Sequence, residues 1–144
     1  MTMTHLRVKR LSETAKLPTK ATHGSAAFDL YADRVQRVQL AVGNQVIVYT
    51  GISTAFAPDH VLLIYNRSGN AVNRGLTLKN AVAVIDSDYR GEIVLHFDNK
   101  IFVPETGDRV AQAILQPIPN VHIIEVNELD NTERDVGGFG STGL

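Results

Sequence analysis

A succession of short segments that favour β-strands, separated by turn-forming residues, constrains the fold of this chain more than any other feature. Each segment is rich in β-branched or aromatic side chains, which suit a pleated, half-buried strand. The segments span residues 35–40, 45–49, 52–56, 61–65, 82–85, 93–97, 110–115 and 121–126, and residues 6–11 alternate similarly. Because only residues 68–73 suggest a helix, the pattern predicts an all-β sandwich or barrel with one short helix.

Size and charge narrow the class of protein. The chain has 144 residues, which suits one domain whose core needs no disulfide or metal. It contains no cysteine (Cys 0), which excludes disulfides, zinc–thiolate sites and cysteine nucleophiles. The net charge of -1 and the absence of a long apolar run argue against nucleic acid or a membrane as partners, and the first residues lack the features of a signal peptide. We therefore expect a soluble protein of the cytoplasm or another intracellular compartment.

The last part of the chain differs in composition from the rest. Residues 127–135 are polar, and residues 137–143 consist of four glycines, two hydroxyl side chains and one aromatic ring. We therefore predict a β domain of residues 1–126 and a flexible arm of residues 127–144. Free amides and hydroxyls in such an arm can bind phosphate and a ring can stack on a base, although a frayed terminus is the simpler interpretation. The G-x-G-x-x-G spacing within 138–143 is not a dinucleotide site, because a single residue follows and no helix can begin there.

Two acidic residues stand beside apolar segments. Asp86 follows the segment 82–85, where its ionisation can be tuned for general-base work, although turn aspartates commonly accept backbone hydrogen bonds instead. Asp29 lies between apolar residues in 26–30, and its simpler interpretation is an edge-strand aspartate paired with a nearby arginine. The chain has five histidines, and their spacing does not suit chelation, which argues against a histidine metal site.

Two further groups of polar residues suit an anion or a ligand. Arg67, Ser68 and Gly69 follow a strand and open the short helix, an arrangement that can bind an anion, or in which Ser68 simply caps its own helix. Gln112 lies on the apolar face of the segment 110–115 and needs a hydrogen-bond partner. That partner is either a ligand or a backbone carbonyl.

These segments together resemble the trimeric dUTP pyrophosphatases (dUTPases), a family marked by five motifs in fixed order. The matching residues are 26–30, 66–69, 80–93, 107–115 and 134–143, which span nearly the whole chain. The resemblance implies a distorted jelly-roll or β-clip subunit that assembles as a homotrimer, with each active site shared between three subunits. It also implies hydrolysis of dUTP to dUMP and pyrophosphate, by in-line attack of water on the α-phosphate.

The resemblance also assigns roles to single residues. Asp86 corresponds to the general base that activates the attacking water, and Tyr89 to the residue that packs against the deoxyribose and blocks a ribose 2'-hydroxyl. Phe139 corresponds to the ring that stacks over the uracil. Uracil recognition is implied for Asn80, Val84 and Ile85; phosphate binding for Arg67, Ser68, Gly69 and Gln112; and tail contacts for Arg134, Gly140, Ser141 and Thr142.

The resemblance implies Mg²⁺ bound through the substrate triphosphate, with no direct protein ligands. Magnesium prefers oxygen ligands and retains several waters, so a triphosphate can carry it without a protein cage. Asp29 is implied near the water shell of the metal or in structural support.

The chain departs from the family pattern at a few positions. Ala27 and Ala83 replace frequent glycines, Asn66 replaces a usual proline, and Asp135-Val136 replaces a usual glycine-containing pair. Two other functions remain open at this point: a dCTP deaminase of the same fold, and a nucleotide-responsive binding protein that regulates a protein partner. Asp86 and the intact segment 134–143 favour hydrolysis.

Overall fold

Ten strands and one short helical turn form the described part of the chain, which is residues 3–99 and 102–143 of a computed structural model. The helical turn η1 (Gly69–Asn73) has π-type geometry and lies between β6 and β7. The predicted domain begins at residue 1 and the predicted arm ends at residue 144, and both of these residues lie outside the described part of the chain. The strands are β1 (Arg7–Arg10), β2 (Phe28–Tyr31), β3 (Arg34–Gln39), β4 (Asn44–Tyr49), β5 (Ile52–Ala55), β6 (His60–Asn66), β7 (Leu76–Leu78), β8 (Ala83–Ile85), β9 (Val94–Asn99) and β10 (Arg109–Pro117).

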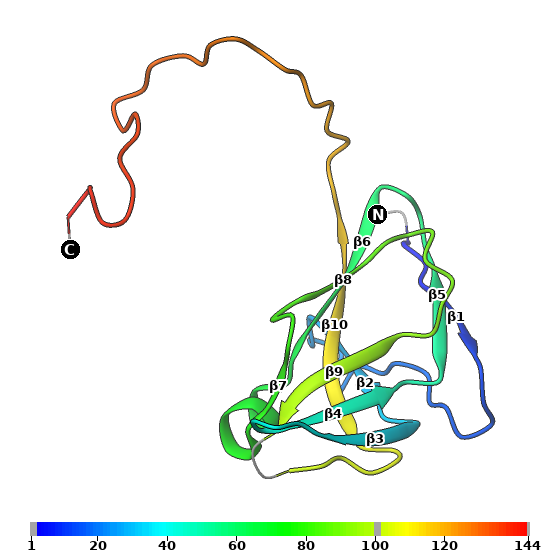
Figure 1. Cartoon of the computed structure of the whole chain (residues 1–144). Coiled ribbons are helices and arrows are strands. Elements are labelled where there is room, and N and C mark those ends of the chain that lie inside the picture. Colours follow the sequence, from blue (N-terminus) through cyan, green and yellow to red (C-terminus); the bar gives the residue numbers. More distant parts are fainter. Residues whose placement is uncertain (1–2, 100–101, 144) are drawn as a thin grey trace.

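The strands form two four-stranded antiparallel sheets and a smaller two-stranded one. The first sheet has the order β2-β10-β6-β8, the second β3-β4-β9-β7, and β1 pairs with β5 (Figure 1). Apolar side chains from both large sheets meet in one core. The architecture confirms the predicted all-β fold with one short helix.

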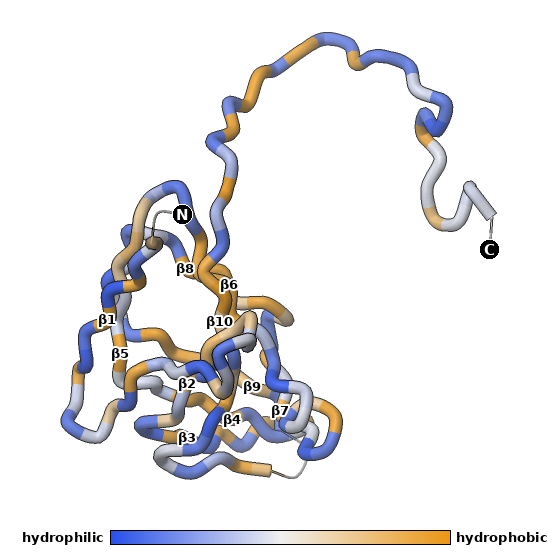
Figure 2. The backbone as a smooth tube through the Cα atoms, turned by 180° about the vertical axis from the view of Figure 1, so that it is seen from behind, coloured by the Kyte–Doolittle hydropathy of each residue, from blue (hydrophilic) through white to orange (hydrophobic). Residues whose placement is uncertain are grey.

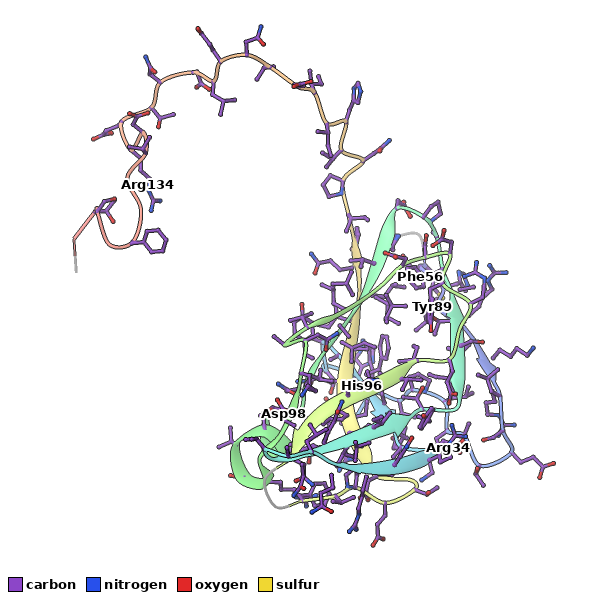
Figure 3. The ribbon with its side chains drawn as sticks, viewed as in Figure 1. Arg34, Phe56, Tyr89, His96, Asp98 and Arg134 are labelled. Carbon is purple, nitrogen blue, oxygen red and sulfur yellow. The ribbon has the colours of Figure 1, made fainter. Side chains whose placement is uncertain are left out.

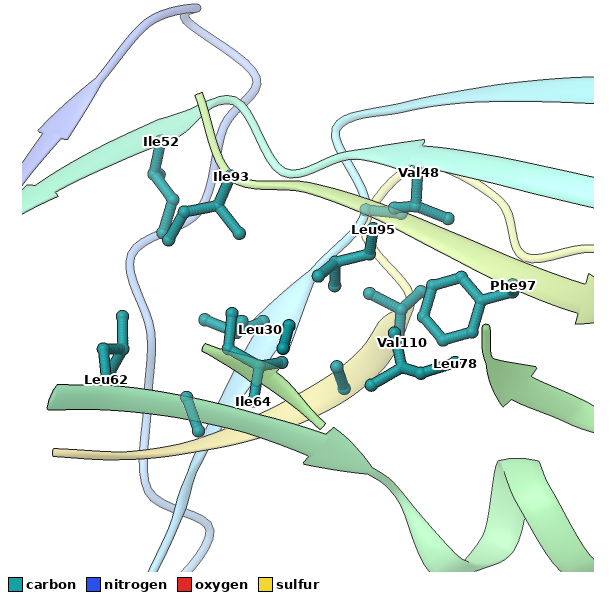
Figure 4. Packing of buried hydrophobic residues seen from close by; sticks show 14 of the residues in the cluster. Leu30, Val48, Ile52, Leu62, Ile64, Leu78, Ile93, Leu95, Phe97 and Val110 are labelled. Carbon is teal, nitrogen blue, oxygen red and sulfur yellow. The ribbon is translucent and has the colours of Figure 1, made fainter. Parts of the chain in front are cut away.

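The core forms because the strands alternate between buried and exposed side chains. In β4, Val46 and Val48 are buried, and the residues beside them point to the other face of the sheet. Phe97 of β9 and Ile64 of β6 are 0% exposed, and side chains from opposite sheets pack around them (Figure 4). Full burial of one such side chain contributes roughly 1.5–3 kcal/mol. The same alternation leaves the outward-facing side chains and the residues at the strand ends free to form polar contacts or to bind a ligand.

Most predicted strands are observed within a few residues of their predicted ends, from 35–40 (β3) to 110–115 (β10). Strand β7 was not predicted, because it has only three residues, and β2 was considered only as an edge strand around Asp29, because this aspartate interrupts the apolar pattern. The strand predicted over 121–126 is wrong for this structure, in which these residues are extended and exposed without a paired strand. A β-favouring segment forms a strand only where another backbone pairs with it.

The chain leaves the body after β10 and continues as an arm (Figure 1). The amide of Ile118 still donates to the carbonyl of Asp59 at 2.8 Å. Along the arm, hydrophobic and hydrophilic residues alternate (Figure 2). Within the described residues, no helix has the length and apolar character needed to cross a membrane.

Candidate active site

A pocket of about 440 Å³ opens where β2 and β10 meet the residues that follow β6. In β10, Gln112 pairs with Asp29 of β2 on one side and with Tyr65 of β6 on the other. The sheet register therefore brings three of the five sequence segments to one place. The lining residues are Ala21, Ser25, Ala26, Ala27, Asp29, Arg67, Ser68, Gly69, Gln112 and Ile114.

Two arginines face one carboxylate in this region. The Nε of Arg67 donates to Oδ1 of Asp29 at 2.8 Å, and Nη1 of Arg109 lies 3.6 Å from Oδ2 of Asp29. The Asp29 side chain is 11% exposed and the Arg67 side chain 26%. Asp29 is thus the paired edge-strand aspartate that sequence reasoning left open, because β2 is an outer strand of its sheet. Two positive charges against one negative charge leave a local positive excess, which suits an anion.

The Ser68 hydroxyl is exposed and does not cap the helical turn. Ser68 occupies the N-cap position of η1, but it makes no side-chain capping hydrogen bond. The interpretation of Ser68 as a simple helix cap is therefore wrong, and its hydroxyl remains available to a ligand. A Cβ on Gly69 would meet no atom within 4 Å, so the glycine leaves open space where it lines the pocket.

Gln112 and two asparagines hold the pocket in shape. Nε2 of Gln112 donates to the backbone carbonyl of Asn66 at 2.9 Å, so its partner in this structure is a carbonyl. Oδ1 of Asn66 accepts the amide of Leu78 at 2.8 Å, which joins the end of β6 to β7. Nδ2 of buried Asn70 donates to the carbonyl of Arg109 at 2.9 Å and fastens η1 to β10. Sequence reasoning noted Asn66 only as a departure from proline and missed Asn70.

Asp86 and Tyr89 belong to a loop that follows β8 and is braced against β5 and its preceding turn. Nη1 of Arg90 donates to the carbonyls of Ser87 at 2.7 Å and Thr54 at 3.3 Å. Oε1 of Glu92 accepts the amide of Gly51 at 2.8 Å. Sequence reasoning did not predict the hydrogen bonds of Arg90 and Glu92 to these backbone groups. The two charged residues on either side of Gly91 were a signal that could have indicated them.

Within this loop, Asp86 is exposed, and its backbone carbonyl accepts the amide of Tyr89 at 3.2 Å. The hydroxyl of Tyr89 donates to the carbonyl of Glu92 at 3.0 Å. The loop is therefore a formed turn that presents the Asp86 side chain to the surface.

Asn80 lines a second pocket, of about 310 Å³, beside β9. The amide of Lys79 donates to the carbonyl of His96 at 2.9 Å, which fixes the start of the loop between β7 and β8. Ala81 has a φ of 58°, a conformation that costs a non-glycine residue energy. Val84, on the outer face of β8, is 61% exposed, and Ile85 is partly buried. The lining residues are Gln45, Lys79, Asn80, Ala83, Val94, Leu95 and His96.

The two groups of residues lie far apart within one chain. Ile85 pairs with Leu62 in β6, and Arg67 lies five residues further along the chain. At about 3.3 Å per residue, Arg67 lies about 16 Å along the strand from the level of Ile85. Asp86 follows Ile85 in the direction away from Arg67, because β8 is antiparallel to β6. A general base must reach the reacting group directly or through one water, so Asp86 cannot serve the pocket of its own chain.

The arm lies apart from both pockets (Figure 3). Nε of Arg134 donates to the carbonyl of Gly137 at 3.0 Å, and the amide of Asp135 donates to Oγ1 of Thr132 at 3.0 Å. Phe139 is fully exposed, and Gly140, Ser141 and Thr142 are exposed as well. The structure thus brings together Asp29, Arg67, Ser68, Gly69 and Gln112, but neither the Asn80–Tyr89 group nor the arm residues.

No three histidine, aspartate or glutamate side chains cluster as a metal site in residues 3–99 and 102–143. Both oxygens of the Asp29 carboxylate face arginines, which makes structural support the role that fits its contacts. A divalent cation at this pocket would therefore need ligands from the bound anion.

Comparison with known proteins decides the family. The dUTPase family model matches residues 13–143. The chain belongs to the dUTPase family. The deoxyuridine 5'-triphosphate nucleotidohydrolase of Hydrogenobaculum sp. is 41% identical over 143 residues, which cover 96% of this chain and 98% of the relative. That of Rickettsia prowazekii is 40% identical, with 100% of both chains covered.

Solved dUTPase structures share the fold of this family member. The dUTPase of Staphylococcus bacteriophage 80alpha, solved with dUPNHPP, superposes with a TM-score of 0.82 at 23% identity, over 97% of this chain and 99% of the phage chain. A mutant dUTPase from phage phi11 of S. aureus, in which the coordination of a structural Mg(II) ion was described, gives a TM-score of 0.75 at 19% identity, over 88% of this chain and 99% of that chain. The predicted jelly-roll fold is confirmed.

Proposed function

We propose that this chain hydrolyses dUTP to dUMP and pyrophosphate, which limits uracil incorporation into DNA and supplies dUMP. The observation that carries the proposal is the pocket in which Arg67, Ser68 and Gln112 meet, with Arg109 beside it as a second positive charge facing Asp29, in a chain of the dUTPase family. A triphosphate needs forked cationic donors and hydroxyl donors, and this pocket provides both. The relatives named above are nucleotidohydrolases, which favours hydrolysis over deamination of dCTP and over a purely regulatory role.

The active site is completed by other copies of the chain in a homotrimer. Asp86 lies too far from the pocket of its own chain to act on a phosphate bound there, and a neighbouring copy removes that constraint. Residues 127–143 extend away from the body of their own chain (Figure 1). In the proposed assembly, this arm supplies Arg134 and Phe139 to the site of another copy. Symmetric assembly of this kind repeats the same composite site at each interface.

In this composite site, different side chains carry out the separate steps of dUTP hydrolysis. Asp86 takes the proton of the water that attacks the α-phosphorus in line, and the bond to the bridging oxygen breaks as pyrophosphate leaves. Arg67 and Arg134 stabilise the charge that develops on the phosphate oxygens. Mg²⁺ bound through the triphosphate would neutralise part of the same charge, with no ligand required from Asp29 or another side chain. Asp29 holds Arg67 in position through the 2.8 Å hydrogen bond.

Selection of the base and the sugar is assigned to the residues around β8. Asn80, Val84 and Ile85 form the uracil site, and Tyr89 packs against the deoxyribose. A site built to pair with the polar edge of uracil leaves buried groups unpaired when cytosine enters. Gly140, Ser141 and Thr142 add donors to the terminal phosphates when the arm closes, and Phe139 stacks over the base.

The test is a product analysis with four nucleotides. The purified protein is incubated with Mg²⁺ and dUTP, dCTP, dTTP or UTP, and the products are separated by chromatography. We expect dUMP and pyrophosphate from dUTP alone, and at least about a hundredfold slower turnover with Asp86→Asn, which removes the base. Ammonia released from dCTP would instead establish deamination, and no turnover of any nucleotide would establish a binding protein.

A further inference from the structure

Gly91 is a glycine for a reason other than backbone conformation. Its φ lies outside the left-handed region, unlike that of Gly51 at 67°. A Cβ built on Gly91 would overlap the hydroxyl oxygen of Tyr89 and lie 2.5 Å from its Cζ and 2.9 Å from its Cε2. Real Cβ atoms do not approach other atoms so closely, so the side chain of Tyr89 lies directly across the backbone of Gly91.

The loop around this contact is held firmly, whereas the ring is not. Arg90 bonds the carbonyl of Thr54, and Glu92 bonds the amide of Gly51, on either side of Gly91. The Tyr89 ring is held through one hydrogen bond, from its hydroxyl to the carbonyl of Glu92. Tyr89 is 45% exposed, so much of its side chain borders open space. A side chain at position 91 would therefore move the ring toward solvent before it moved the loop.

We propose that Gly91 is a specificity-determining position, which seats the Tyr89 ring at the depth where a deoxyribose fits and a ribose does not. The inference rests on the proposed function, in which Tyr89 packs against the sugar. The ring distinguishes a hydrogen from a hydroxyl at C2', which is a difference of about one atom in size. Discrimination of that size depends on the position of the ring to within a few tenths of an ångström, and the absent side chain of Gly91 defines that position.

The experiment measures kcat and KM of Gly91→Ala with dUTP and with UTP. The added methyl group displaces the ring toward solvent and away from its position against the sugar, so the contact with the deoxyribose weakens and a 2'-hydroxyl is no longer excluded. We therefore expect KM for dUTP to rise about tenfold and kcat to change by less than about threefold. We also expect the ratio of kcat/KM for dUTP to that for UTP to fall by at least about tenfold. A purely structural effect of the alanine would lower the active fraction and leave both KM and this ratio unchanged.

Gly24→Ala is the matched control, because a Cβ at Gly24 would meet no atom within 4 Å and its φ is not positive. Its kinetic constants are expected to match those of the unmodified chain. A crystal structure of Gly91→Ala then shows whether the Tyr89 ring has moved and lost its bond to Glu92.

The outcomes separate the two proposals. If the unmodified chain hydrolyses dUTP and rejects UTP, but Gly91→Ala keeps the same KM and the same ratio, the inference about Gly91 is wrong and the proposed function stands. A ring in its original place in the variant crystal structure overturns the inference as well. If the unmodified chain hydrolyses neither nucleotide, the proposed function fails, and the inference fails with it.

Discussion

Replacement of Asp29 by asparagine tests what this carboxylate does in the pocket. The change keeps the size of the side chain and removes the charge that faces Arg67 at 2.8 Å and Arg109 at 3.6 Å. Two guanidinium groups then lie beside each other without a counter-charge. We expect the folded state to lose stability and Arg67 to lose its fixed position.

The exposure of the Asp29–Arg67 ion pair determines how much free energy of unfolding the substitution costs. Two unit charges 2.8 Å apart attract by about 6 kcal/mol at an effective dielectric constant of about 20, before desolvation is subtracted. Removal of one partner from a fully buried pair costs about 3–5 kcal/mol, whereas an exposed pair contributes about 0–1 kcal/mol. With Asp29 11% and Arg67 26% exposed, the pair lies between these two limits. We expect Asp29→Asn to lower the free energy of unfolding by about 2 kcal/mol, or to lower Tm by about 6–8 °C.

The assay is chemical denaturation at one fixed protein concentration, together with dUTP kinetics. Asp98→Asn is the matched control, because Asp98 pairs with Lys79 at 3.0 Å while their side chains are 61% and 40% exposed. That variant is expected to lose no more than about 0.5 kcal/mol. KM for dUTP should rise in Asp29→Asn, because Arg67 is no longer held toward the phosphates.

Equal stability of Asp29→Asn and Asp98→Asn would refute this reasoning. If Asp29→Asn also required more Mg²⁺ for half-maximal activity, its carboxylate would act on the water shell of the metal rather than on Arg67. A loss of stability with an unchanged Mg²⁺ requirement supports the structural role.

Three further predictions concern the rest of the chain. Asn66→Ala should lower the free energy of unfolding by about 1–2 kcal/mol in denaturation experiments, because it leaves the amide of Leu78 without its acceptor; an unchanged midpoint would contradict this. Phe97→Ala should cost about 3–5 kcal/mol by the same measurement, because Phe97 is 0% exposed, and a loss below about 1 kcal/mol would mean that the core repacks. Deletion of residues 137–144 should leave the denaturation midpoint unchanged and lower kcat at least about a hundredfold, since the described residues of this segment contribute nothing to the core; a shifted midpoint would show a structural role.

The strands that sequence reasoning found are those whose pattern is local. In β4, the run of β-branched and aromatic residues 46–49 is visible within the six residues of the strand, and the structure buries Val46 and Val48. In β2, Asp29 interrupts the pattern, and its burial depends on Arg67, which lies 38 residues further along the chain. No local rule reports such a partner. Residues 121–126 show the converse, because their β-favouring side chains predict a strand that needs a pairing backbone outside the described chain.

The site could be predicted as separate motifs but not as a geometry. Asp29, Arg67 and Gln112 were each named from the sequence, and for Asp29 and Gln112 a side-chain or backbone partner was left open as the alternative. The structure shows those alternatives in part, because Asp29 pairs with arginines and Gln112 bonds the carbonyl of Asn66. Nothing in the spacing indicates that Asp86 and Arg67 lie at opposite ends of β6, since this follows from the register of β8.

Complementation between two inactive variants tests the composite site most directly. Asp86→Asn removes the base, Arg67→Ala removes the phosphate contact, and each variant alone should have little activity. If each site takes Asp86 from one copy and Arg67 from another, refolding an equal mixture should restore up to about a quarter of the activity, because that fraction of sites combines two intact groups. If both groups served one site from the same chain, no mixed site would be intact, and the mixture would stay as inactive as its components.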